Sequence, residues 1–111
     1  MPVLYKGKGK KKELVSGIEA RIVSMDSLMT LVSEISFGVQ QSPIPLHAHV
    51  AEQTTYILEG ELTVFIEGEA PARLKPGDMY YVASGVPHTI QSHSKTVRVV
   101  ESFSPPRKEF L

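Results

Sequence analysis

The chain has 111 residues, of which 41% are hydrophobic, and its 12 basic and 12 acidic residues cancel to a net charge of zero. This length predicts one domain over 1–111 with a single core, and the hydrophobic content excludes a disordered tail. No apolar run approaches the roughly 20 residues of a membrane-spanning helix, so we expect a cytoplasmic protein without membrane contact. Because cysteine is absent, nitrogen and oxygen donors must hold any metal.

The first expected element is a flexible basic arm over residues 1–12. Its lysines are Lys6, Lys8, Lys10, Lys11 and Lys12. Such a run could contact nucleic-acid phosphates. No recognisable nucleic-acid-binding fold lies beside it, so we expect a solvated arm and no nucleic-acid partner. The core is then expected over about 20–104.

Short β-prone runs alternate with turn signals along the rest of the chain, which is typical of an all-β sandwich or barrel. The expected strands cover residues 20–23, 28–37, 54–58, 62–67, 79–82 and 96–103. The two prolines of segment 42–45 predict a loop, because proline removes a donor from a strand ladder.

Glu59-Gly60 predicts a tight hairpin turn in which glycine takes a positive φ. Apolar residues alternate on both sides of this turn and predict the inward face of its two strands. These residues are Tyr56, Leu58, Leu62, Val64 and Ile66.

Three of the four histidines fall into one pattern, with His47 and His49 one residue apart, Gln53 four residues on, and His88 far downstream. Residues i and i+2 of a strand point the same way, so His47 and His49 could close on one metal ion. His88 would arrive from another strand. Three imidazoles and an amide oxygen leave room for water or substrate, as catalytic metal sites do. The alternative is that these are ordinary buried or surface histidines. His93 lies outside the pattern, and we expect it to be an ordinary surface residue.

Two segments resemble the two motifs of the cupin family: His47-x-His49-x3-Gln53-x6-Gly60 and Gly77-x5-Ala83-x-Gly85-x2-His88. The resemblance implies a single-domain cupin, which is a double-stranded β-helix or jelly-roll barrel. The first motif usually has Glu where Gln53 stands. A neutral amide would leave a bound divalent ion its full charge and make it a stronger Lewis acid.

A second cluster lies near the C-terminus. Val97, Val99, Glu101 and Phe103 occupy alternate positions, so inward-facing valines would direct Glu101 toward the barrel mouth. Partial desolvation there would raise the pKa of Glu101 and make it a plausible general acid or base. Arg107 could pair with a carboxylate through two parallel hydrogen bonds. The alternative is that Glu101 and Arg107 are solvated charges near the chain end.

Segment 47–60, the turn 74–78 and the ending 101–107 together resemble the KdgF-type pectin degradation proteins. These small cupins bind a divalent metal and convert 4,5-unsaturated uronates from pectin or alginate into the linear keto form. The resemblance implies metal ligands at His47, His49, Gln53 and His88. It also implies a substrate site for a sugar acid, with Glu101 and Arg107 catalytic and with Phe103 and Arg107 contacting substrate. The family usually has Asp where Glu101 stands.

The sequence leaves several alternatives open. The metal could be Ni, Zn, Fe or Mn, and with Fe(II) the chain could be an oxygen-using cupin dioxygenase. A sugar-binding or sensor module without turnover is a third possibility, so enzymatic activity is favoured but open. We also expect a homodimer, because a barrel this small leaves strand edges that a two-fold axis could pair.

Overall fold

The computed structural model describes residues 2–38 and 44–111. Its strands are β1 (Lys11–Val15), β2 (Ile18–Ser24), β3 (Met29–Ile35), β4 (Glu52–Glu59), β5 (Leu62–Ile66), β6 (Ala72–Leu74), β7 (Met79–Val82), β8 (His88–Ser92) and β9 (Val97–Ser104), followed by the 3₁₀ helix η1 (Lys108–Phe110). The expected all-β class is confirmed. Of the expected loop 42–45, residues 42 and 43 lie outside the described part of the chain.

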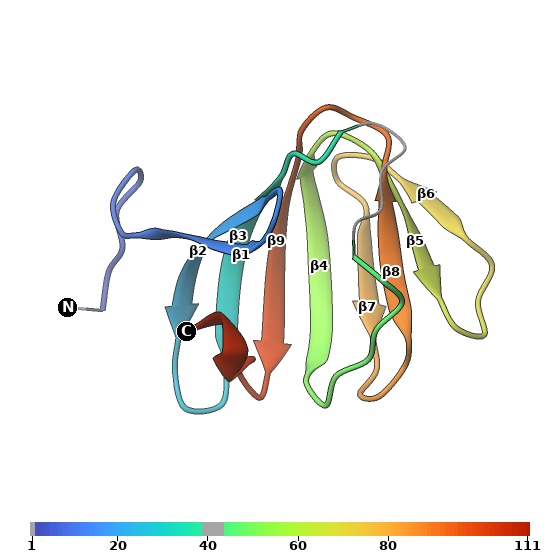
Figure 1. Ribbon diagram of the computed structural model, residues 1–111. Helices are drawn as coiled ribbons and strands as arrows, with labels where there is room; N and C mark the ends of the chain where they lie inside the picture. Colours follow the sequence, from blue (N-terminus) through green and yellow to red (C-terminus); the bar gives the residue numbers. More distant parts are fainter. Residues whose placement is uncertain (1, 39–43) are drawn as a thin grey trace.

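Two antiparallel sheets form the jelly roll (Figure 1). The larger sheet has the strand order β1-β2-β3-β9-β4-β7, and the smaller has the order β6-β5-β8. β9 lies beside β3 and β4 although it follows both by many residues, so the last strand of the chain closes the middle of the larger sheet. No helix in the described segments is long and apolar enough to cross a membrane.

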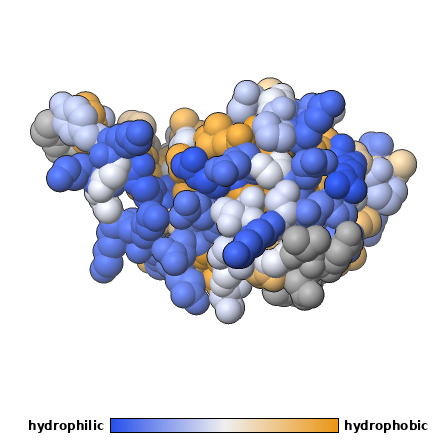
Figure 2. Space-filling view, turned by 90° about the horizontal axis from the view of Figure 1, so that it is seen from above, coloured by the Kyte–Doolittle hydropathy of each residue, from blue (hydrophilic) through white to orange (hydrophobic). Residues whose placement is uncertain are grey.

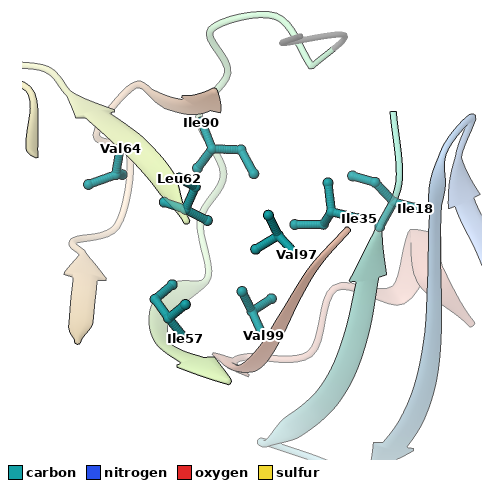
Figure 3. Packing of buried hydrophobic residues seen from close by; sticks show 8 residues of the cluster. All are labelled: Ile18, Ile35, Ile57, Leu62, Val64, Ile90, Val97 and Val99. Atoms are coloured by element: carbon teal, nitrogen blue, oxygen red, sulfur yellow. The ribbon is translucent and has the colours of Figure 1, made fainter. Parts of the chain in front are cut away.

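The inner faces of the sheets supply the core. β3 has buried side chains at every second position, beginning at Met29. β9 follows the same alternation with Val97, Val99 and Phe103 buried and Glu101 partly buried. The larger cluster comes from both sheets (Figure 3): Ile18, Ile35, Ile57, Leu62, Val64, Ile90, Val97 and Val99. Burying each such side chain contributes on the order of 1.5–3 kcal/mol. Ile18 is buried, so the core begins slightly before the expected residue 20.

The expected hairpin at Glu59-Gly60 is wrong. β4 pairs with β7 and β9, whereas β5 pairs with β6 and β8, so the chain crosses from one sheet to the other at this turn. Gly60 has φ 77°, and a Cβ added there would lie 2.5 Å from the Thr96 carbonyl oxygen. Glycine is therefore required by a close backbone approach as well as by its conformation.

The inward face expected for β4 is also wrong. Tyr56 and Leu58 are each 39% exposed, whereas Gln53, Thr55 and Ile57 are buried. An alternation shared across a hairpin does not apply to strands in different sheets, because each strand takes its inner face from its own sheet. The correction matters for function, since it directs Gln53 into the interior.

The basic arm is shorter than expected. Lys11 and Lys12 belong to β1 and pair with Arg21 and Ala20 of β2. Residues 2–10 are exposed and stand out from the body at the left of Figure 2. The Arg21 guanidinium donates to the carbonyl oxygens of Tyr5 and Lys8, at 2.8 and 2.9 Å. These bonds attach the arm to the outer face of β2.

Candidate metal site and cavity

The backbone brings His47 to His88. The two residues form an isolated antiparallel bridge, with N···O distances of 3.1 and 2.8 Å. His49 is fixed one step further on, where its carbonyl oxygen accepts from the Gly85 amide at 2.9 Å. His47 and His49 precede β4 rather than lying in a strand. The rings are therefore brought together by backbone hydrogen bonds from His47 to His88 and from Gly85 to His49, in addition to the expected i, i+2 spacing of His47 and His49.

The three imidazoles form a tight cluster. The ring centroid of His88 lies 4.3 Å from that of His47 and 4.8 Å from that of His49, and the centroids of His47 and His49 are 5.7 Å apart. One nitrogen from each ring can be chosen so that all three lie within 4.8 Å of one another. This spacing is small enough for one ion to be bound by all three.

Each imidazole has its Nδ1 occupied by a backbone carbonyl two residues away. His47 bonds to Pro45, His49 to Ala51 and His88 to Val86, at 2.8–3.0 Å. A carbonyl only accepts, so each Nδ1 carries the proton and each Nε2 presents a lone pair. The Nε2 of His49 is buried and has no hydrogen-bond partner among the described residues. This is the arrangement in which outer hydrogen bonds orient metal-binding histidines.

The protonation of the cluster also suits a metal. Burial is the main cause that lowers the pKa of His88 to about 4, with smaller contributions from the neighbouring His47 and His49. Burial likewise lowers the pKa of His49 below its usual 6.5. Both rings are therefore neutral at pH 7, as ligation requires. An unpartnered buried nitrogen, fixed tautomers and neutral rings fit a divalent ion with nitrogen and oxygen ligands, and the cluster can hold such an ion.

Gln53 lies near the histidines on the inner face of β4. Its side chain is 5% exposed. Its Nε2 donates to Thr55 Oγ1 at 3.0 Å and to the Tyr80 hydroxyl at 3.5 Å. Both amide hydrogens therefore have hydroxyl acceptors, and Oε1 is the atom of the amide that offers lone pairs. This oxygen is the atom that could serve as a fourth ligand.

His47, Gln53 and His88 line one cavity of about 290 Å³, whereas His49 is not part of its lining. Its polar wall consists of His47, Gln53, Tyr80, His88, Glu101 and Arg107, with Ser33 and Thr89 nearby, and the rest of the lining is mainly apolar: Leu14, Val15, Ile18, Ile35, Ile44, Pro45, Ile90, Phe103 and Phe110. Small-molecule sites span about 300–1,000 Å³. This cavity is at the small end of that range, which suits a monomeric ligand rather than a polymer.

Glu101 and Arg107 both line this cavity. Burial raises the pKa of Glu101 to about 7, and the positive charge of Arg107 partly opposes that rise. The Arg107 guanidinium lies 4.3 Å from the ring centroid of Phe110 and 5.3 Å from that of Phe103. Its Nη2 is 3.4 Å from Glu109, and its buried Nε has no partner in the described part of the chain. The two rings hold the guanidinium while leaving donors free for a ligand.

Three features were not foreseen from the sequence. Tyr80 and Phe110 line the cavity, and burial raises the pKa of Tyr80 so that the phenol keeps its proton. The signal for Tyr80 was its alternation with buried Val82 in β7. His93 is not an ordinary surface residue, because it is partly buried with its Nε2 2.6 Å from Thr63 Oγ1. His93 is also absent from the cavity lining.

Residues 34–103 match the family model described as Cupin domain. The chain belongs to the cupin family. Within it, the chain is 32% identical to the pectin degradation protein KdgF of Dickeya dadantii over 102 residues, covering 90% of the chain and 89% of that protein. It is also 37% identical over 70 residues to the dimethylsulfoniopropionate lyase DddQ of Ruegeria pomeroyi, covering 63% of the chain but only 33% of that protein.

Solved structures show the same fold. The structure of KdgF from Halomonas sp. matches with a TM-score of 0.84 at 24% identity, covering 97% of this chain and 98% of that one. An RmlC-like cupin from Shewanella frigidimarina matches with a TM-score of 0.83 at 23% identity, covering 96% and 93%. At these identities the likeness concerns the fold, and the jelly-roll architecture is confirmed.

Proposed function

We propose that this cupin is a metal-dependent enzyme that opens 4,5-unsaturated uronates to their linear keto form. One observation carries the proposal. Glu101 has a carboxyl pKa near neutrality and Arg107 has free guanidinium donors, and both line the same small cavity as His47 and His88 of the histidine cluster. The likeness to KdgF over nearly the whole chain supports a sugar acid as the substrate.

In this proposal His47, His49, Gln53 and His88 would hold a divalent ion. When bound, the ion would supply Lewis-acid polarisation of a substrate oxygen. None of these four residues is a carboxylate or thiolate, so they would leave the charge of the ion uncompensated. The remaining positions would stay open toward the cavity, as in catalytic rather than structural sites.

Arg107 would bind the uronate carboxylate. The rings of Phe103 and Phe110 lie 5.3 and 4.3 Å from its guanidinium carbon and hold the group in place, and a planar guanidinium can give a carboxylate two parallel hydrogen bonds. Phe103, which is 1% exposed, would support this geometry and contact the sugar ring. The substrate would thus be oriented with its unsaturated carbon toward Glu101.

Glu101 would move the proton. Opening the ring removes the proton of the C1 hydroxyl as the bond between C1 and the ring oxygen breaks, which leaves an aldehyde at C1 and an enolate at C5. A proton delivered to C4 then gives the ketone, so the overall reaction is an isomerisation. A carboxyl with a pKa of about 7 is poised both to take and to return a proton at neutral pH.

The direct test is to incubate the metal-loaded protein with an unsaturated uronate and follow the loss of its ultraviolet absorbance. We expect acceleration over the spontaneous reaction, and we expect Glu101→Gln to abolish it while retaining the metal. Absence of acceleration with metal bound would contradict the proposed substrate and favour a binding or sensor module. Oxygen consumption with an iron-loaded sample would instead favour a dioxygenase.

We further propose a homodimer that works in the cytoplasm. Four large side chains on the outer face of β4 and β7 are exposed: Tyr56, Leu58, Met79 and Tyr81. β7 is an edge strand of the larger sheet, and unprotected edges favour pairing with a second copy. Light scattering at micromolar concentration should give twice the mass of one chain, and a monomer would contradict the dimer.

A further inference from the structure

Gln53 is the one proposed ligand whose side chain ends in two chemically different atoms. Its Oε1 can bind a divalent cation, whereas its Nε2 has no available lone pair. The fourth ligand position therefore depends on which way the amide is turned. A residue that fixes the amide would act on the metal without touching it.

Two hydroxyl groups lie on the nitrogen side of this amide. Nε2 is 3.0 Å from Thr55 Oγ1 and 3.5 Å from the Tyr80 hydroxyl, so its two hydrogens have two acceptors. Thr55 and Tyr80 are register partners on the neighbouring strands β4 and β7. Thr55 is 1% exposed, and Tyr80 faces the cavity. Neither residue is needed to hold an ion itself.

We infer that Thr55 and Tyr80 are positioning residues that keep Oε1 of Gln53 turned toward the imidazoles. Without them, a buried NH₂ group would lack acceptors, and the amide would gain by rotating or withdrawing from the site. A second-layer hydrogen bond of this kind typically changes metal affinity 10–100-fold. The inference rests on the proposed metal site, and it adds two residues that determine its affinity.

The chain offers matched controls for the test. Thr54 and Tyr81 are the sequence neighbours of the two positioning residues and pair with each other in the same register. They face outward, and Tyr81 is 78% exposed. The affinity for Zn²⁺ would be measured in the full-length protein by competition with a chromophoric chelator. We expect Thr55→Val and Tyr80→Phe each to weaken zinc binding about tenfold or more, while Thr54→Val, Tyr81→Phe and the hydroxyl-retaining Thr55→Ser stay within about twofold.

A double-mutant cycle separates positioning from general damage to the fold. In a Gln53→Ala background the amide is gone, so adding Tyr80→Phe should weaken zinc binding by less than about twofold. An equal loss in both backgrounds would overturn the inference, and so would unchanged affinity in Tyr80→Phe alone. Tyr80→Phe decides the matter if Thr55→Val does not fold. A wild-type protein that binds no zinc would overturn the proposed metal site together with this inference. Zinc binding by the wild type that Tyr80→Phe does not weaken would overturn the inference alone.

Discussion

The raised pKa of Glu101 predicts that this residue makes the fold less stable as the pH rises. The pKa changes from 4.5 to about 7 on folding. The folded state therefore keeps a proton that the unfolded chain has released between these values. Stability is lost through this window because the unfolded state binds fewer protons there. Below about pH 4.5 the effect vanishes, and above about pH 7 it is complete.

The size of the effect follows from the same difference. Each pH unit corresponds to about 1.4 kcal/mol, which gives at most about 3.5 kcal/mol for Glu101. Glu101 is only partly buried, and screening by solvent reduces this to about 2 kcal/mol. Glu101→Gln should remove the dependence, so its free energy of unfolding relative to wild type should rise by about 2 kcal/mol between pH 5 and pH 8.

The assay is urea unfolding of chelator-treated wild-type and variant proteins at several pH values. Titration of the histidines is common to both proteins and cancels in the difference. Glu69→Gln is the matched control, because Glu69 is exposed and its difference from wild type should not vary with pH. A constant difference between wild type and Glu101→Gln would show that Glu101 is not desolvated, and the proposed proton transfer would lose its basis.

Other predictions concern the turn, the ligands and the guanidinium. Gly60→Ala should destabilise the protein by at least about 2 kcal/mol in urea unfolding, because its Cβ would lie 2.5 Å from a carbonyl oxygen. Gly68 has a similar φ but open space around it, so Gly68→Ala should cost only about 1 kcal/mol. Equal losses in the two variants would contradict the close approach at Gly60. His88→Ala should lose zinc in a chelator competition without unfolding, and full retention would remove His88 from the ligand set. Since the pKa values of His49 and His88 are lowered, zinc should still be bound at pH 6, where a free imidazole is mostly protonated; release near pH 6.5 would contradict the assigned burial. Arg107→Lys should raise the KM for an unsaturated uronate about tenfold through loss of the two-pronged carboxylate contact, and an unchanged KM would place the carboxylate elsewhere.

Much of the fold followed from local signals. The turn at Lys75–Asp78 is present, with the Asp78 carboxylate accepting from the Lys75 amide at 2.9 Å. The strand β7 over residues 79–82 has the expected limits. The sequence pattern did not determine which strands pair with one another. Glu59-Gly60 has the composition of a hairpin turn, but Leu62 is drawn into the smaller sheet by tertiary packing, which no local pattern records.

The candidate site was likewise predictable from the sequence only in part. The histidine spacing pointed to a cluster, and the structure brings His47, His49 and His88 together. Gln53 was foreseen at the site although the wrong face of β4 was predicted to be buried. Tyr80 was missed because its role depends on the pairing of β4 with β7, which sets it opposite Thr55, a residue 25 positions earlier in the chain. Such partners become visible only once the strand order is known.

The most direct test of the central claim is an elemental analysis of the purified protein after exposure to divalent metals and removal of excess. We expect about one transition-metal ion per chain in the wild type and none in a His47→Ala, His88→Ala double variant that remains folded. A folded wild-type protein with no bound metal, or a double variant that retains as much as the wild type, would contradict it.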